Sequence, residues 1–315
     1  MVQMKIRPRS TFVCAVTPFA QDGSLHVEGV RSLVGRLGDA AVGTYLASAS
    51  PGEGHALSLD ETEQLYGVAL EAMGGRASVR AMGVECRTAE QYLPLLQIAG
   101  SVGLDAIQLY SLDCGHGNAP TPMELERYFR TLLDQAPLPC VLSSHMYNGY
   151  LVPVDLVSRL IDDYPHLIGL NVTTTDLPYL VRLIQTVDNR ADVHVGGPMQ
   201  ALTVLALGGQ GFLSTDGNIV PRLCASVIDN FKSGNLDDLF AAYSLLMKVF
   251  SINVWPGGSM RWLKAAMRVT NQPGSYLRGP YIPLELEEQD QIRLSLQELN
   301  VVAVEGLELL EDPGT

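Results

Sequence analysis

The chain contains little lysine and little charge of either sign. Only four of its 315 residues are lysine (Lys5, Lys232, Lys248 and Lys264), and 17% of the residues are charged. The formal net charge is −13, and the sequence contains no cluster of Lys and Arg residues. Nucleic-acid binding needs clustered basic side chains that displace phosphate counterions. We therefore expect no nucleic-acid partner.

Long apolar runs and paired cysteines are also missing. No stretch approaches the ~18 uninterrupted apolar residues of a membrane-spanning helix. The first ten residues contain no apolar core of a secretory signal. The five cysteines are scattered and form no CxxC pair, which is typical of reduced thiols. These absences predict a cytoplasmic protein that does not bind membranes.

Short apolar runs alternate with longer amphipathic segments along the chain. The runs, which we interpret as strands, lie at 11–17, 43–48, 78–84, 105–111, 139–144, 167–172, 192–196 and 211–214. The segments between and after them, which we interpret as helices, lie at 26–40, 60–74, 88–102, 122–135, 153–163, 176–187, 199–207 and 221–232. Eight β/α units with such apolar strands predict an α/β fold, a closed (β/α)8 TIM barrel. No GxGxxG follows the first strand, which disfavours a dinucleotide-binding sheet.

The domain organisation follows from the point at which the strands stop. Residues 1–234 are expected to form the barrel, and residues 235–315 a helical C-terminal extension packed on it, with helices at 235–252, 257–270 and 285–308. The two ends, 1–10 and 311–315, have no such pattern and are expected to be loose tails.

Barrels of this class carry their chemistry at the carboxyl ends of the strands. Several segments at the ends of the predicted strands resemble the dihydrodipicolinate synthase / N-acetylneuraminate lyase family. The likeness extends over roughly residues 10–300. It is carried by VTPF at 16–19, ASPGE at 49–53, IGLN at 168–171, GGQGFLS at 208–214, and Arg278 with Pro280. The resemblance implies a small-molecule substrate, no cofactor, and a homotetramer or homodimer.

The sequence departs from the family at the residues that carry the chemistry. Relatives hold a keto acid as a Schiff base on a lysine of the sixth strand, where this chain has Asn171. An amide has no nucleophilic amine, and no other lysine is expected close to a strand end. The family's proton-relaying tyrosine aligns with Asp113, or with Tyr110 three residues earlier. The paired threonines of the second strand become Ser50 and Pro51, and the fifth-strand arginine is missing at 146–150.

Candidate catalytic residues follow the fourth strand. Asp113 or His116 could move a proton near neutral pH, and Tyr110 could relay it. The alternative is that Asp113 and His116 only cap backbone groups of a loop. Ser50 could relay a proton through its hydroxyl or cap the helix that follows.

Candidate substrate-binding residues follow the second, fifth and sixth strands. His145 and Tyr147 could donate hydrogen bonds to a substrate oxygen, while Asn171 and Thr173 offer an amide and a hydroxyl. Glu53 is expected to contribute to the same binding surface. A metal held by Asp113, His116, His145 and Glu53 is a weaker alternative, because no HExxH or HxH spacing occurs. We therefore predict no metal.

Two functions remain open. The first is an enzyme that works without a Schiff base and uses acid/base catalysis for proton abstraction, C–C or C–O cleavage, or condensation on a small polar carbonyl or carboxylate metabolite. The second is a catalytically inactive barrel that binds a ligand or a protein. The substrate itself does not follow from the sequence.

Overall fold

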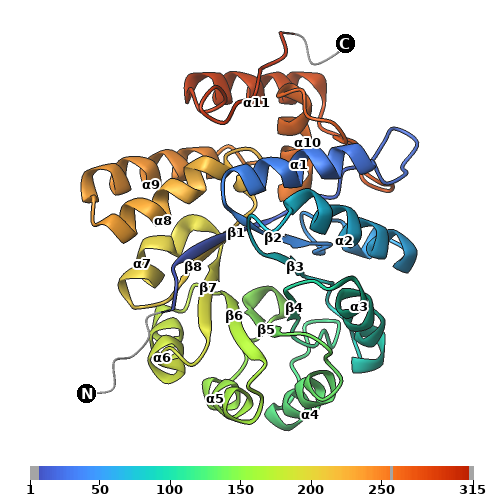
Figure 1. Cartoon of the computed structure of the whole chain (residues 1–315), viewed down its shortest axis with the longest axis vertical. Coiled ribbons are helices and arrows are strands. Elements are labelled where there is room, and N and C mark those ends of the chain that lie inside the picture. The colour runs from blue at the N-terminus through green and yellow to red at the C-terminus, as the bar shows by residue number, and fades with distance from the viewer. Residues whose placement is uncertain (1–6, 256–257, 312–315) are drawn as a thin grey trace. The chain divides into compact units, whose positions relative to one another are not determined.

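Eight parallel strands close into a barrel in the computed structural model of the chain, which confirms the predicted (β/α)8 TIM barrel with a helical C-terminal extension (Figure 1). The structure describes residues 7–255 and 258–311. The strands are β1 Ser10–Cys14, β2 Gly43–Leu46, β3 Val79–Ala81, β4 Ala106–Leu109, β5 Cys140–His145, β6 Leu167–Thr173, β7 Asp192–Gly196 and β8 Gly211–Ser214. The helices are α1 Val27–Asp39, α2 Leu59–Met73, α3 Ala89–Val102, α4 Pro122–Leu133, α5 Val154–Asp163, α6 Leu177–Val187, α7 Ala201–Ala206, α8 Pro221–Ser233, α9 Leu236–Phe250, α10 Ser259–Val269 and α11 Leu286–Glu298.

Local sequence signals account for where the helices begin and end. At the start of α2, the Ser58 side chain accepts a hydrogen bond from the Glu61 N–H, while the Glu61 carboxylate accepts one from the Ser58 N–H. This reciprocal pair satisfies two backbone donors that a helix start leaves unbonded. At the other end, Gly74 adopts φ 57°, a left-handed conformation that glycine enters without strain and that terminates the helix.

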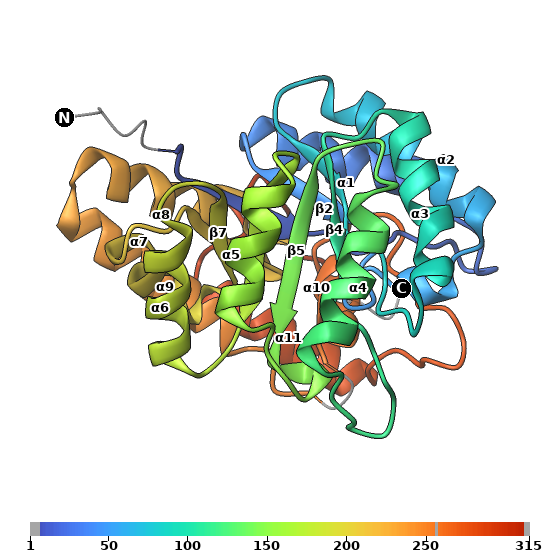
Figure 2. The ribbon, with the colours of Figure 1, turned by 90° about the horizontal axis from the view of Figure 1, so that it is seen from below.

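The chain divides into two compact units. Unit 1 comprises Arg80–Leu213 and the N-terminal segment up to Ser10. Its strands β4 to β7 pair in parallel, with α3, α4, α5 and α6 outside them (Figure 1). In Figure 2, β5 runs between α4 and α5, and its arrowhead marks the carboxyl end at which we expect the chemistry. All six residues of β5 are buried, as expected for a strand covered on both faces.

Unit 2 comprises Thr11–Val79 and Ser214–Thr315. In it β1 pairs with β2, α1 packs on α2, α8 on α9, and α10 on α11. The C-terminal helices thus belong to the same unit as the first two strands. The last helix is shorter than the predicted 285–308, because α11 ends at Glu298 and Asn300 takes a left-handed φ of 53°.

The predicted loose tails fall mainly on residues 1–6 and 312–315, which lie outside the described residues. Within the rest of the N-terminal segment, Arg7 forms an ion pair with Asp192, and Ser10 begins β1. This part of the predicted tail is therefore bonded to unit 1.

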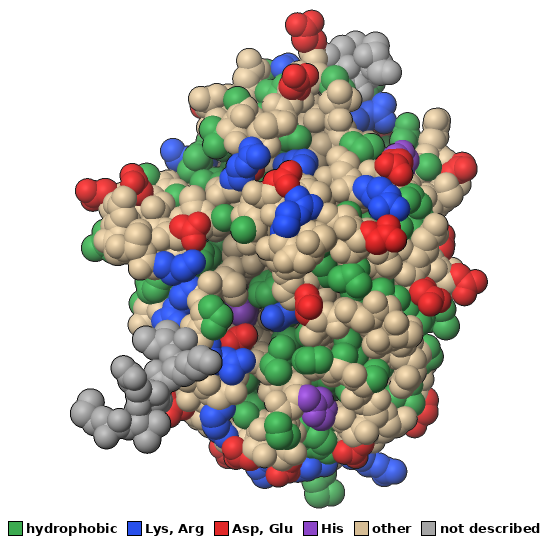
Figure 3. Space-filling view, viewed as in Figure 1, with side chains coloured by type: hydrophobic (Ala, Val, Ile, Leu, Met, Phe, Trp, Pro, Cys, Tyr) green, Lys and Arg blue, Asp and Glu red, His purple; other side chains and the backbone are tan. Residues whose placement is uncertain are grey.

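The surface carries charges of both signs. On the face seen in Figure 3, Lys and Arg side chains lie among Asp and Glu side chains and do not gather into a basic stripe. Within the described ranges, no helix combines the length and apolar character that crossing a membrane requires.

Candidate active site

The sixth strand places Asn171 inside the barrel. Its side-chain N–H group donates a hydrogen bond to the side-chain Oε1 atom of Gln108 in β4, and both side chains are buried. Because β5 lies between β4 and β6, this bond crosses the barrel interior, so both side chains point inward. The Asn171 Oδ1 atom is also buried, and it has no hydrogen-bond partner among the described residues. Burying an unpaired polar atom costs about 1–3 kcal/mol, so this oxygen marks a place for a ligand donor.

Polar side chains continue along the interior on β7. His194 lies in register with Asn171, and its Nε2 atom is 2.9 Å from the Ser10 hydroxyl. Burial lowers the pKa of His194 to about 3, so this imidazole stays neutral at physiological pH. His194 therefore has a structural hydrogen bond and does not act as an acid or base near neutral pH.

His145 ends β5 two residues beyond Ser143, which is paired with Asn171 in the sheet. The His145 side chain is buried, and its Nε2 atom lies 3.5 Å from the Glu85 carboxylate, which comes from the loop after β3. This distance suits an ion pair with a protonated ring, but neither ring nitrogen meets hydrogen-bond geometry with any described residue. A histidine whose Nδ1 atom has no partner among the described residues and whose Nε2 atom faces a carboxylate can serve as a general base.

Two tyrosines flank this imidazole. The buried ring of Tyr110 meets the His145 ring edge-on, with 5.5 Å between the ring centroids and 88° between their planes. The Tyr147 ring centroid lies 5.9 Å from that of His145, and Tyr147 is 77% exposed. Thr173 is half-buried at the end of β6, paired with His145 in the sheet. Glu85, Tyr110 and His145 therefore form one cluster at the strand ends of unit 1, and Asn171 points into the barrel two residues before the end of β6.

The loop after β4 carries Asp113 and His116 toward solvent. Asp113 is 44% exposed, accepts a hydrogen bond of 2.8 Å from the Gly115 N–H, and lies 4.0 Å from the Arg87 guanidinium. His116 is exposed and takes a left-handed φ of 52°. These contacts match the loop-capping alternative for Asp113. The catalytic roles of Asp113 and His116 remain predictions.

In unit 2, the residues after β2 contact the C-terminal helices. The Ser50 hydroxyl lies 3.2 Å from the Ser259 hydroxyl of α10. Glu53 has no exposed surface, and one of its carboxylate oxygens accepts a hydrogen bond of 3.1 Å from the backbone N–H of Arg278. Burial raises the pKa of Glu53, and Lys264 opposes that effect. The substrate-binding role of Glu53 remains a prediction.

One expectation from the sequence is wrong. Lys264 of α10 lies next to the loop that follows β1, where it donates hydrogen bonds to the Thr17 and Gly274 carbonyls at 2.5 and 3.1 Å. The Lys264 side chain thus contacts Thr17, which lies three residues beyond the end of β1. Burial lowers the pKa of Lys264 to about 8. The sequence could not reveal this position, because the packing of α10 is not encoded in any local motif.

A buried carboxyl group follows β8. The Oδ2 atom of Asp216 accepts a hydrogen bond of 3.1 Å from the Ser214 hydroxyl. Its Oδ1 atom has no hydrogen-bond partner in the described chain, and burial raises the pKa of Asp216 to about 6. The residues 216–218 form a 3-10 turn, as the Asp-Gly pair predicts.

Three residues of these clusters escaped the sequence analysis. Gln108 sits inside a strand, and only its spacing of two from Tyr110, which puts both on one face, could have indicated it. Glu85 is a single acidic residue in the loop after β3, and Lys264 is far from any strand in the sequence. For residues 7–255 and 258–311, no group of three or more His, Cys, Asp or Glu side chains is arranged to hold a metal ion.

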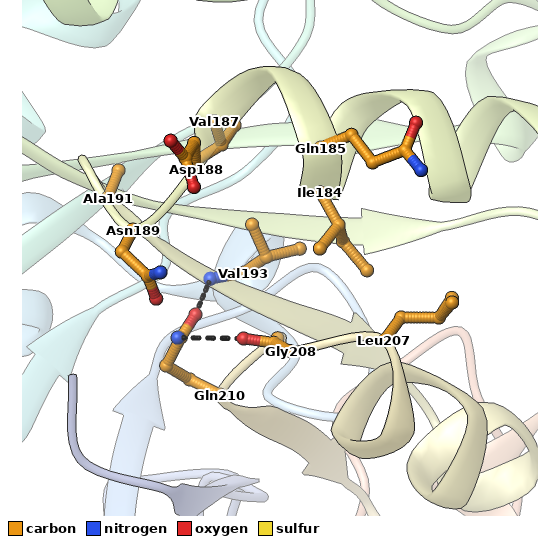
Figure 4. Close-up of a pocket in the computed structure, with 11 residues that line it drawn as sticks. Ile184, Gln185, Val187, Asp188, Asn189, Ala191, Val193, Leu207, Gly208 and Gln210 are labelled. Carbon is orange, nitrogen blue, oxygen red and sulfur yellow. Dashed lines mark hydrogen bonds between the residues drawn. The ribbon is translucent and has the colours of Figure 1, made fainter. Parts of the chain in front are cut away.

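A cavity of about 200 Å³ lies at the opposite ends of β7 and β8 (Figure 4). Apolar side chains of α6 (Ile184 and Val187) line it together with Leu207, which follows α7, and Gln210. The Gln210 carbonyl accepts a hydrogen bond of 2.7 Å from the Val193 N–H, and its amide donates one of 3.3 Å to the Gly208 carbonyl. Because barrel enzymes react at the carboxyl strand ends, this cavity is not the candidate active site.

Comparisons with known proteins give a consistent result. Residues 7–299 match the family described as Dihydrodipicolinate synthetase family. A 4-hydroxy-tetrahydrodipicolinate synthase of Methanoculleus marisnigri is 28% identical, over 88% of this chain and 94% of that protein. Another, from Methanococcus aeolicus, is 24% identical over 93% of this chain and 100% of that protein. Among solved structures, YagE of E. coli K12 in complex with pyruvate has a TM-score of 0.85 and 23% identity, covering 93% of this chain and 99% of that chain.

Proposed function

Because this chain belongs to the dihydrodipicolinate synthetase family of aldolase-type lyases, we propose that it makes or breaks a bond next to the carbonyl of a small carbonyl or carboxylate metabolite, without a Schiff base. Pyruvate, which is bound in the similar E. coli structure, is the first compound to test.

The observation that carries the proposal is the amide of Asn171. It occupies the sixth strand inside the barrel, where the resemblance implies a lysine, and one end of the amide is buried without a partner. An amide can hold a substrate through hydrogen bonds, with its oxygen accepting from a substrate donor and its N–H donating to a substrate oxygen, but it cannot condense with a carbonyl. Lys264, the buried lysine of unit 2, already donates to two backbone carbonyls, which leaves its amine poorly available for covalent chemistry.

The proposed reaction uses His145 as the base. Its Nδ1 atom, which has no hydrogen-bond partner among the described residues, takes a proton from the carbon next to the substrate carbonyl. The electron pair of that C–H bond forms a C=C bond, and the π pair of the C=O bond moves onto the carbonyl oxygen. The Tyr110 hydroxyl donates a hydrogen bond to the resulting enolate oxygen, and so does the second N–H of the Asn171 amide, whose first N–H is bonded to Gln108. Glu85, at 3.5 Å, stabilises the imidazolium that forms.

The bond-forming step completes the cycle. The enolate carbon attacks the carbonyl carbon of a second molecule, and the alkoxide so formed takes the proton back from His145. The reverse sequence cleaves the same C–C bond. No electrons are gained or lost, so neither direction needs a redox cofactor.

The half-reaction gives an assay that needs no second substrate. In D2O, proton abstraction exchanges the methyl protons of pyruvate for deuterium, and the loss of the methyl signal is followed by ¹H NMR. We expect exchange above the buffer rate with the wild-type protein. His145→Gln should slow it by about 10²–10⁴-fold, the usual contribution of a general base. His116→Gln is the matched control and should leave the rate within about twofold.

The alternatives predict other results. A large loss in the His116→Gln or Asp113→Asn variant, with His145→Gln unaffected, would move the proton transfer to the loop after β4. Stabilisation of the protein by pyruvate or another 2-oxo acid, with no exchange or turnover of any compound that binds, would favour a binding protein. We further propose a homodimer or homotetramer in the cytoplasm, and light scattering after size-exclusion chromatography tests the assembly.

A further inference from the structure

Helix α10 buries an ammonium group against the loops that follow β1 and β2. The Nζ atom of Lys264 donates to the Thr17 carbonyl at 2.5 Å and to the Gly274 carbonyl at 3.1 Å, and the side chain is only 2% exposed. Charged donors make stronger hydrogen bonds than neutral ones, and a buried ammonium must keep its partners. The loop after β1 is therefore fixed to α10.

Thr17 passes this restraint to the loop after β2. Its hydroxyl donates a hydrogen bond of 2.5 Å to the Gly52 carbonyl. The Gly52 N–H in turn donates to the Ser48 hydroxyl at 3.0 Å, and the Gly54 N–H donates to the Ser48 carbonyl at 2.8 Å. Two consecutive bonds thus link the ammonium to the turn at residues 50–52.

Glu53 provides a second connection to the same ammonium. Its Oε1 atom lies 3.8 Å from the Lys264 Nζ atom and has no hydrogen-bond partner within the described part of the chain. The Glu53 backbone adopts a left-handed φ of 51°, which a residue other than glycine adopts only at a cost in energy. Attraction between the two buried charges holds this conformation in place.

Helix α10 also reaches the turn directly. Its first residue, Ser259, places a hydroxyl 3.2 Å from the Ser50 hydroxyl. Helix α10 therefore contacts Ser50 through its first residue. Five residues later, its Lys264 contacts Thr17 in the loop after β1 and Glu53 in the loop after β2.

We propose that Lys264 is a positioning residue, which through Thr17 and Glu53 fixes the turn that presents the Ser50 hydroxyl. The C-terminal extension is then part of the catalytic machinery and more than a cover for the barrel. This proposal goes beyond the proposed function, whose steps do not use Ser50, because the participation of Ser50 in catalysis is an expectation from the sequence.

Hydrogen–deuterium exchange of the backbone tests the positioning without any substrate. In Lys264→Met, the peptide covering residues 48–56 should exchange at least about tenfold faster, because a charge-assisted link to the loop is lost. The peptide covering α8 in the same unit should change less than the 48–56 peptide. Thr17→Val keeps the lysine and should reproduce the effect, which covers the case that Lys264→Met fails to fold. Lys248→Met, on the exposed surface of α9, is the control.

The outcomes are distinct. Exchange at 48–56 within about twofold of wild type in both Lys264→Met and Thr17→Val would overturn the proposal. So would a uniform increase over all of unit 2, which indicates a general loss of stability.

The pyruvate exchange rate supplies the second readout. A positioning role predicts that kcat and kcat/KM fall together by about tenfold or more in Thr17→Val, whereas a purely structural role leaves the folded enzyme's kcat unchanged. If Thr17→Val speeds hydrogen–deuterium exchange of the backbone at 48–56 but leaves kcat unchanged, the claim that this turn contributes to catalysis is overturned. If the wild-type protein catalyses no exchange of any 2-oxo acid, the proposed function fails, and the backbone measurement alone decides whether Lys264 fixes the turn.

Discussion

Replacing Asp216 with asparagine should make unit 2 more stable at neutral pH. The carboxyl group is 1% exposed, one of its oxygens accepts a hydrogen bond from the Ser214 hydroxyl, and the other has no partner among the described residues. Asparagine has the same shape and keeps an acceptor for Ser214. It removes the charge, which is the costly part of burying this group.

The magnitude follows from the pKa. The ordinary pKa of this carboxyl is 3.8, and burial raises it to about 6 in the folded chain. At about 1.4 kcal/mol per pKa unit, the ionised side chain costs the folded state about 3 kcal/mol. A folded-state pKa above the unfolded value means that the folded chain binds the proton more tightly, so stability falls as the pH rises from 3.8 to about 6. The full cost is present above that range.

Urea unfolding followed by tryptophan fluorescence measures this cost in the relevant unit. Both tryptophans, Trp255 and Trp262, lie in unit 2. We expect Asp216→Asn to raise the free energy of unfolding by about 3 kcal/mol near pH 7.5 and by about 1 kcal/mol near pH 4.5. Asp229→Asn, which changes an exposed carboxylate of α8, should alter it by less than about 0.5 kcal/mol.

Two results would refute this reasoning. The first is an Asp216→Asn protein that is less stable than wild type near pH 7.5. The second is a gain that does not grow with pH, because the gain is expected to follow the ionisation of one group.

Three further predictions concern other contacts. Lys264→Met should lower the free energy of unfolding by about 3–5 kcal/mol near pH 7.5, because it leaves the Glu53 carboxylate buried without its cation. Burial raises the pKa of Glu53, so this loss of stability should shrink as the pH falls and Glu53 takes up a proton. The double variant Lys264→Met/Glu53→Gln should recover most of the loss in urea titrations near pH 7.5 and at lower pH. Tyr110→Phe should slow pyruvate exchange by about tenfold or more, and an unchanged rate would remove the hydroxyl from the mechanism. Thr121→Ala should destabilise unit 1 by about 1 kcal/mol in urea, through loss of the α4 cap, and no change would contradict the capping role.

The fold was predictable because local and global signals agree. Each strand is a short apolar run, each helix has its own periodicity, and caps such as Ser58 and Gly74 lie at the ends of the helical segments. The end of α11 was predicted too late, because the apolar residues at 301–302 extend the helical pattern although the left-handed Asn300 has already ended the helix.

The candidate site was only partly predictable. Strand order brings His145 and Asn171 to the same end of the barrel, and the sequence already indicates that. The carboxylate beside His145 could not be chosen in advance, because Glu85 comes from a loop whose course is set by packing. The same limit applies to Lys264, which reaches the loop after β1 from 247 positions away in the sequence.

Reductive trapping with borohydride in the presence of pyruvate tests the central claim most directly. Borohydride converts an imine between a lysine and a keto acid into a stable amine, which intact-protein mass spectrometry detects and peptide mapping locates. Because Asn171 has no amine and Lys264 is bonded to two carbonyls, the account predicts an unmodified mass for a protein that still exchanges the pyruvate methyl protons. A stoichiometric adduct on any of the four lysines, Lys264 above all, would contradict it.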